Sequence, residues 1–399
     1  MTLLCQAWLT PLAFAESWGH YSSKRCVSSA SRSANWSEPM LQPFNASTMP
    51  FRIEPLRVLT PKKAREDGGE CAEQPVAPEA SKRPTCADPQ SLRDSGIRML
   101  VGVMSSPKAR ERRDGIRQTW MRWPSVGHSV VVCFVLGRLG PSPTLLQSLD
   151  DEAREHKDVL WLPSAPDGCS GQHMHIAKAY EFWVAAAATL PRGRGRVHVV
   201  KTDDDAQLHL PWLQRELGLL RCVSGLFYGP MVWVGFNPAT FKQCGWDWTS
   251  PSRYHAYKCP GRGFHEAAPY ALGALEVLSD DLARALAASA AVTNFVAAST
   301  ARPVVIEDPV LGYWLSSPQM RSVISVTYVR AYVGNLNCHR PNAGGGRVLN
   351  HSVGMHHLKL PAAQRYAWDL LRGKPYDQPE CSGRTNPHDP NWKAYGHLH

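Results

Sequence analysis

Short apolar runs alternate with amphipathic segments from residue 97 onward. Four of these runs contain few polar residues, as is typical of strands buried on both faces of a sheet: IRMLVGVMS (97–105), SVVVCFVLG (129–137), DVLWLP (158–163) and RVHVV (196–200). The segments between them have helical spacing, and they predict a helix entered near Asp114 and helices over 145–157 and 171–190. Strands that alternate with helices predict an α/β fold in which helices cover both faces of a mainly parallel sheet.

The first 95 residues differ from the rest of the chain in composition and periodicity. Residues 16–95 are rich in Ser, Pro, Glu, Lys and Arg and show no sustained period, so they predict a disordered stem. The apolar start, MTLLCQAWLTPLAFA, ends like a signal-peptide cleavage site, but it lacks a basic beginning and is shorter than the roughly 20 apolar residues of a membrane span. We predict a weak signal or anchor and stem over 1–95, a folded domain over 96–365 and an extension over 366–399; alternatively, the true start lies upstream.

Composition narrows the partners and the compartment. The chain of 399 residues has a formal net charge of +10, but its basic residues form no stripe or basic-aromatic platform, so we expect no nucleic-acid partner. Eleven cysteines without a CxxC pair argue against a zinc ribbon or a thioredoxin-like site. Their spread and the sequons at Asn35, Asn45 and Asn350 favour disulfides and the secretory pathway.

Three consecutive aspartates follow the run 196–200, in the stretch KTDDD (201–205). Ligands of parallel sheets bind beyond the carboxyl ends of the strands, which is where this triplet lies. Carboxylates this close share a site when a cation neutralises them, and their hard oxygens suit Mg²⁺ or Mn²⁺. The alternative is a solvated acidic turn in which an aspartate caps a helix over LPWLQREL.

Five ordered blocks carry a resemblance to a known family. They are RRDGIRQTW (112–120), FVLG (134–137), KTDDDAQL (201–208), PYALGALEVLSDDLA (269–283) and EDPVLG (307–312). In order and spacing this chain resembles the β1,3-galactosyltransferase-like family of inverting nucleotide-sugar transferases. The resemblance implies a GT-A fold, Mn²⁺, UDP-galactose or UDP-N-acetylglucosamine as donor, and a glycan acceptor on a glycoprotein or glycolipid. It also implies a β1,3 linkage and a Golgi-luminal enzyme with a type II membrane anchor.

The same resemblance assigns roles to the residues of KTDDD. It makes Asp205 a metal ligand and places Asp203 and Asp204 near the ribose and diphosphate. A metal here acts as a Lewis acid on the departing UDP. Lys201 either adds positive charge for the phosphates or is a strand-end lysine in solvent.

The block RRDGIRQTW supplies Arg113 and Arg117, which are one helical turn apart. Guanidinium forks match phosphate and ribose oxygens, and the resemblance puts this block beside the nucleotide. The alternative is a solvated helix face. We interpret Trp120 as a core residue.

An inverting transferase needs a carboxylate to take the proton of the acceptor hydroxyl. Glu307 and Asp308 follow an apolar run, and the resemblance favours Asp308 as this base. Asp308-Pro309 is also a good helix start. The resemblance further implies a late histidine as a second protein ligand of the metal; among His351, His356 and His357, we choose His356.

Two blocks depart from the family pattern. In PYALGALEVLS (269–279), Gly273 indicates a close approach, and Glu276 stands where the family usually has tyrosine on the acceptor side. Of another family block only Asp167 and Lys178 are present, and no role is assigned to them. Two other functions stay open: a non-catalytic glycan- or UDP-binding protein of this fold, and a metal-dependent phosphohydrolase.

Overall fold

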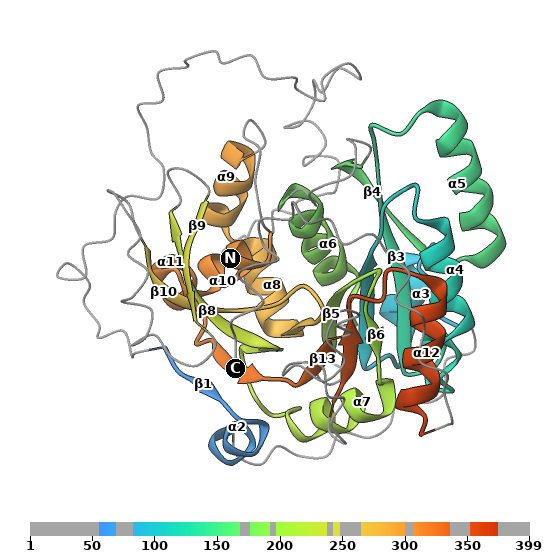
Figure 1. Cartoon of the computed structure of the whole chain (residues 1–399). Coiled ribbons are helices and arrows are strands. Elements are labelled where there is room, and N and C mark those ends of the chain that lie inside the picture. Colours follow the sequence, from blue (N-terminus) through green and yellow to red (C-terminus); the bar gives the residue numbers. More distant parts are fainter. Residues whose placement is uncertain are drawn as a thin grey trace, which may run out of the picture.

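The centre of the molecule is a mixed sheet of eight strands in the order β1-β12-β7-β11-β5-β2-β3-β4 (Figure 1). The computed structural model describes residues 56–68, 83–167, 176–191, 197–237, 242–247, 265–299, 307–335 and 352–373. The strands are β1 (Val58–Leu59), β2 (Met99–Met104), β3 (Val130–Leu139), β4 (Val159–Pro166), β5 (His198–Asp203), β7 (Leu226–Gly229), β11 (Glu276–Ser279) and β12 (Thr327–Arg330). Only β11 is antiparallel to its neighbours, β5 and β7, so the predicted mainly parallel sheet is confirmed.

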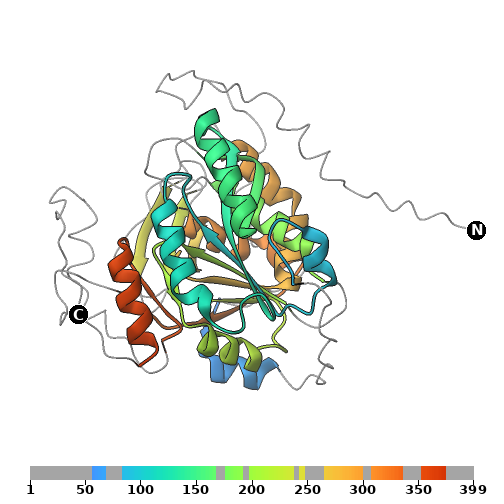
Figure 2. The same cartoon turned by 90° about the vertical axis from the view of Figure 1, so that its right-hand side faces the viewer.

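Helices cover both faces of this sheet (Figures 1 and 2). They are α2 (Pro61–Gly68), α3 (Pro89–Asp94), α4 (Arg110–Gln118), α5 (Pro143–His156), α6 (Ile176–Thr189), α7 (Leu210–Leu219), α8 (Asp280–Ala288), α9 (Ala290–Ser299), α10 (Asp308–Ser316), α11 (Pro318–Arg321) and α12 (Pro361–Leu371), with a 3₁₀ turn η2 at Trp120–Arg122. Successive strand residues face opposite cores: Val199 packs with α6, α8 and α10, and Val200 packs with α4 and α7. The architecture is the predicted α/β, Rossmann-like GT-A fold.

Two small sheets flank the main one. β8 (Met231–Asn237) is antiparallel to both β9 (Lys242–Asp247) and β10 (His265–Ala271). β14 (Gly354–His356) lies between β13 (Val333–Asn335) and β6 (Gln207–Leu208). Because β6 follows β5 after a short turn, this second small sheet brings a late part of the chain to the end of β5.

The predicted helices and strands from 97 to 200 are present, with shifted ends. α4 begins at Arg110 rather than near Asp114, since Ala109 already accepts the first helical hydrogen bonds, from the backbone N–H groups of Arg112 and Arg113. Of the helix predicted over 171–190, the described part is α6. The three sequons and His351 lie outside the described residues.

The predicted stem over 1–95 is wrong for residues 56–68 and 83–95, which belong to the folded domain. β1 extends the main sheet beside β12, and Ala64 of α2 and Leu92 of α3 are buried in opposite cores. A few apolar side chains are enough here because the sheet supplies the rest of the apolar surface. At the other end, α12 crosses the predicted boundary at residue 365 and packs on Met355 and Leu358, so the folded part reaches residue 373.

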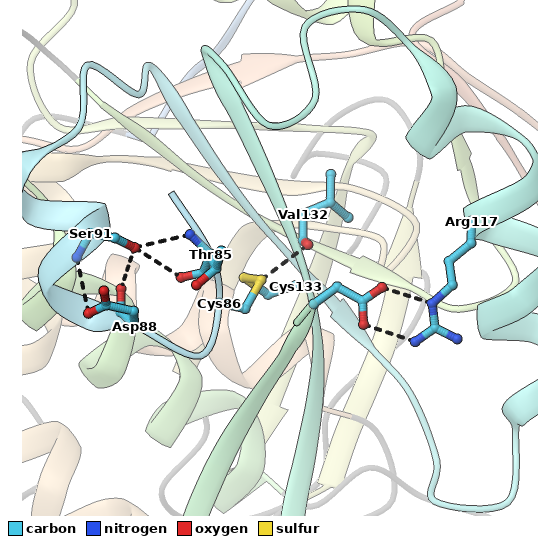
Figure 3. The surroundings of a disulfide bond; sticks show 8 residues. Thr85, Cys86, Asp88, Ser91, Arg117, Val132 and Cys133 are labelled. Carbon is cyan, nitrogen blue, oxygen red and sulfur yellow. Dashed lines mark hydrogen bonds and ion pairs between the residues drawn. A yellow bond between two sulfur atoms is a disulfide. The ribbon is translucent and has the colours of Figure 1, made fainter. Parts of the chain in front are cut away.

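A disulfide joins the segment before α3 to β3, the strand next to the edge strand β4 of the main sheet. Cys86 bonds to Cys133 of β3, with a Cα–Cα distance of 5.6 Å (Figure 3). Asp88 caps α3 by accepting hydrogen bonds from the backbone N–H groups of Gln90 and Ser91. The disulfide confirms that some of the cysteines staple the fold, as expected for a protein of an oxidising compartment.

Among the described helices, none is by itself long and apolar enough to cross a membrane. α8 and α9 together reach the required length and composition, with a bend of 64° between them.

Candidate active site

The end of β5 places the three aspartates in different surroundings. Asp203 is the last strand residue and pairs with Met104 of β2, and a turn closed by Ala206 N–H to the Asp203 carbonyl follows. Alternation along β5 puts Lys201 and Asp203 on one face of the sheet and Asp204 on the other. The Asp203 side chain is 28% exposed and that of the nearly buried Asp205 is 12% exposed, so both carboxylates keep some access to solvent.

The pairing of β14 with β6 delivers a histidine to these aspartates. Leu358 N–H donates to the Asp205 carbonyl at 2.8 Å, which fixes the segment after β14. His356 Nε2 then lies 3.1 Å from Asp205 Oδ1 and 3.4 Å from Asp203 Oδ2. The choice of His356 among the late histidines thus agrees with its position.

Asp203, Asp205 and His356 form a donor set that fits a metal ion. One ligand atom from each lies within 4.8 Å of the others. Burial opposes the charged imidazole, but hydrogen bonds to Asp203 and Asp205 raise the pKa of His356 to about 10. A proton therefore occupies the nitrogen that a cation would take, as expected of a metal ligand that competes with protonation. Two hard oxygens and an imidazole nitrogen suit Mn²⁺ better than Mg²⁺.

A second carboxylate approaches this triad across Gly273. The backbone N–H of Gly273 donates to Asp308 Oδ2 at 2.7 Å. A Cβ atom at residue 273 would lie 2.8 Å from Asp203 Oδ2 and 2.9 Å from Asp308 Oδ1. A side chain at residue 273 would therefore displace the two carboxylates, which confirms the close approach predicted at this position. Asp308 is also the first residue of α10, so the helix-start interpretation and a chemical role are compatible.

Lys201 and Glu276 are buried behind Asp308. They are direct partners in the antiparallel pairing of β5 and β11, and both side chains are 0% exposed. Lys201 Nζ lies 3.1 Å from Glu276, 3.2 Å from Glu307 and 3.6 Å from Asp308. This position corrects both interpretations of Lys201, which faces carboxylates rather than solvent or a phosphate. Glu276, which replaces the tyrosine usual in the family, is buried.

One ammonium does not balance three carboxylates, and burial favours their protonated forms. Burial raises the pKa of Glu307 to about 7 against the opposing charge of Lys201. Burial likewise raises the pKa of Asp308 and, further, that of Glu276. The three carboxylates attract Lys201 strongly enough to raise its pKa although burial alone would lower it.

The guanidinium that faces the aspartates belongs to Arg112, a residue to which the sequence pattern assigned no role. Arg112 Nη1 donates to Asp204 Oδ1 at 2.7 Å, and Ser105 Oγ donates to Asp204 Oδ2 at 2.9 Å. Because successive helix residues point about 100° apart, only one of the adjacent arginines 112 and 113 can face Asp204. The sequence does contain a signal for the Ser105 contact, because Ser105 ends the first apolar run and the aspartates end the fourth. In a parallel sheet both ends lie at the same edge.

Arg113 and Arg117 instead form an internal network with Glu152 and Asp158. Arg113 is 0% exposed and makes a two-point contact with Glu152 at 2.8 and 2.7 Å. Arg117 makes the same kind of contact with Asp158 at 2.8 and 2.9 Å, and it stacks over Phe134. This corrects the prediction that they contact the nucleotide: their donors already have carboxylate partners inside the fold.

The structure also shows the positions of the α7 cap, of Trp120 and of the pair Asp167 and Lys178. His209, not an aspartate, caps α7 by accepting from Trp212 N–H, which weighs against the acidic-turn alternative. Trp120 is fully buried, as predicted. Asp167 and Lys178 contact each other at 2.6 Å, and Lys178 also donates to the Ser105 carbonyl at 2.7 Å.

Comparison with known proteins agrees with this geometry. The family described as Galactosyltransferase matches residues 111–323, which is more than half of the 399 residues. A mouse acetylgalactosaminyl-O-glycosyl-glycoprotein β1,3-N-acetylglucosaminyltransferase is 30% identical over 195 residues, 45% of each chain. β1,3-Galactosyltransferase 7 of Arabidopsis thaliana is 28% identical over 140 residues, 33% of this chain and 34% of that protein.

These matches span about a third to a half of the relatives' length. The family match includes α4, the aspartates, Gly273 and Asp308, and it ends before His356. The chain belongs to the galactosyltransferase family.

Proposed function

We propose that this protein transfers galactose or N-acetylglucosamine from a UDP-sugar to a glycan hydroxyl, with inversion and formation of a β1,3 linkage. The relatives are named for both sugars, which supports the sugar class but does not choose between them. The observation that carries the proposal is a metal-type triad, Asp203, Asp205 and His356, with Asp308 next to it across Gly273.

Asp308 is the proposed base of this reaction. The acceptor hydroxyl oxygen bonds to the anomeric carbon while the bond from that carbon to the UDP oxygen breaks and its electron pair leaves with UDP. The hydroxyl proton passes to Asp308, whose carboxylate is 23% exposed and fixed on one oxygen by Gly273. Glu307 is more deeply buried and contacts Lys201, so we propose that it supports Asp308 rather than taking this proton.

Asp203, Asp205 and His356 would hold Mn²⁺, which would supply positive charge to the diphosphate of the donor. Asp204 is oriented by Arg112 and Ser105, and we propose that it contacts the nucleotide from the opposite face of β5. In this proposal the three aspartates and His356 bind the donor, and Asp308 acts on the acceptor.

The disulfide between Cys86 and Cys133 supports a place in the secretory pathway. We propose the Golgi lumen, with acceptors on glycoproteins or glycolipids, and membrane attachment as a type II protein. Two measurements would check this placement: immunofluorescence of the protein together with a Golgi marker, and the glycosidase sensitivity of any glycans attached to it.

The first experiment measures UDP release from UDP-galactose and UDP-N-acetylglucosamine, with Mn²⁺ or with a chelator. Wild type, Asp205→Ala and the control Asp151→Ala, on the exposed side of α5, are compared with and without galactose- and N-acetylglucosamine-terminated acceptors. We expect acceptor-stimulated release that requires Mn²⁺ and Asp205 and is unchanged in the control. Folded protein that binds UDP and Mn²⁺ but releases UDP from neither donor would contradict the transferase proposal and favour a non-catalytic binding protein.

A further inference from the structure

We propose that Lys201 and Glu276 are positioning residues for the base Asp308, and that Lys201 serves this side of the site instead of the donor phosphates. This inference rests on the proposed function. It assigns to the buried pair the orientation of the base, which differs from the metal-binding role proposed for Asp203, Asp205 and His356.

The first observation is the direction of the Lys201 side chain. Its ammonium is 0% exposed, whereas Asp308 is 23% and Asp203 is 28% exposed. The ammonium is therefore closed to solvent, whereas both carboxylates keep access to it. A ligand that arrives from solvent meets Asp203 and Asp308 and not the ammonium of Lys201.

The second observation is how Asp308 is held. Gly273 N–H donates to one oxygen, Oδ2, at 2.7 Å, and Lys201 Nζ lies 3.6 Å from the other, Oδ1. Glu307, the preceding residue, contacts the same ammonium at 3.2 Å. Lys201 therefore attracts both carboxylates at the start of α10, which would otherwise repel each other and the nearby Asp203.

Glu276 keeps the ammonium in this place. It lies directly opposite Lys201 in the sheet register, and its carboxylate is 3.1 Å from Nζ. The turn between β10 and β11 is tied to β5 as well, because Thr202 Oγ1 donates to the Ala274 carbonyl at 2.7 Å. Glu276, Gly273 and Lys201 consequently form one rigid support, with the Asp308 carboxylate at its edge.

The test separates this role from simple stabilisation and from donor binding. The variants are Lys201→Met, Glu276→Gln and the double variant Lys201→Met/Glu276→Leu. Lys201→Met leaves the buried Glu276 without its cation, whereas the double variant replaces both with an apolar pair of similar volume and leaves only Glu307 and Asp308 without the ammonium. The control is Tyr228→Phe, which removes another buried hydrogen bond, to Glu216 of α7 and away from the triad. Each is measured for melting temperature, for UDP affinity with Mn²⁺ by calorimetry, and for kcat and KM with saturating acceptor.

We expect the double variant to fold and to melt above Lys201→Met, to bind UDP within about twofold of wild type, and to lose about tenfold or more in kcat. Tyr228→Phe should lower the melting temperature and leave kcat unchanged. A folded double variant with wild-type kcat would overturn the inference and leave the pair a purely structural one. A large loss of UDP affinity with kcat retained would return Lys201 to the donor side and also overturn it.

The wild type separates this inference from the proposed function. If wild type turns over and the double variant does too, only the positioning role fails. If folded wild type turns over neither donor, the transferase proposal and the positioning role fail together.

Discussion

The two charged regions of this protein differ in how their charges are matched. In the first, which we term the arginine network, the buried Arg113 and Arg117 face Glu152 and Asp158, and the more exposed Arg110 and Asp114 add one further charge of each sign. In the second, the carboxylate cluster, Lys201 and His356 face five carboxylates: Asp203, Asp205, Glu276, Glu307 and Asp308. Positive and negative charges are equal in number in the arginine network, whereas the carboxylate cluster has an excess of negative charge.

This difference separates structure from function better than residue type does. The guanidinium of Arg113 is fully buried, and all three of its nitrogens donate inside the fold, to Glu152, Ser105 and the Ser106 carbonyl. Carboxylates in excess retain their affinity for a cation, and part of the cluster is open to solvent. We therefore expect changes in the carboxylate cluster to affect turnover and changes in the arginine network to affect folding.

The largest effect should come from the base. Asp308→Asn keeps the size of the side chain but removes the proton acceptor, so we expect kcat to fall by about 10²- to 10⁴-fold. UDP affinity in the presence of Mn²⁺ should stay near wild type, because the triad is unchanged. The measurement is steady-state kinetics together with calorimetry of UDP binding; near-normal kcat would assign the proton transfer to another group.

In the arginine network, Arg113→Met should act on stability. It leaves Glu152 buried without its two-point partner, and we expect the free energy of unfolding to fall by about 3–5 kcal/mol. Urea denaturation measures this loss. The paired variant Arg113→Met/Glu152→Leu should recover part of it. Unchanged stability of Arg113→Met, combined with a loss of UDP affinity, would restore Arg113 to the nucleotide site.

Acid should weaken the same network. Burial opposes the ionised form of Glu152, but hydrogen bonds from Arg113 and Arg117 lower its pKa from 4.5 to about 2. Its contribution is thus fully present above pH 4.5 and is lost as the pH falls toward 2. The loss is on the order of 3 kcal/mol, because one pKa unit is worth about 1.4 kcal/mol. Urea denaturation of wild type and Glu152→Gln across this range isolates the effect; parallel curves would contradict it.

The smallest effect is expected where the two regions meet. Arg112 belongs to the same helix as the arginine network but contacts Asp204, and this pair is partly exposed. Arg112→Met should raise the KM for the donor about fivefold, since a partly exposed ion pair contributes about 1 kcal/mol. Arg215→Met, an exposed arginine on α7, is the control. A destabilised fold with an unchanged donor KM would place Arg112 in the network instead.

Much of the fold follows from local pattern. The apolar runs before residue 200 predicted β2, β3, β4 and β5, because strands that are buried on both faces contain few polar residues. The early segment was misjudged because β1, α2 and α3 are each too short to show a period. They fold against a core that the rest of the chain provides.

The sequence by itself determined where the candidate site lies: consecutive aspartates at a strand end, a glycine where two carboxylates converge, and an Asp-Pro at a helix start. Tertiary structure alone decided which arginine faces the aspartates and that Lys201 meets Glu276. The physical reason is that helix rotation and strand register depend on packing between distant segments, as in the pairings of β11 with β5 and of β14 with β6. Neighbouring residues such as Arg112 and Arg113 thereby acquire opposite roles.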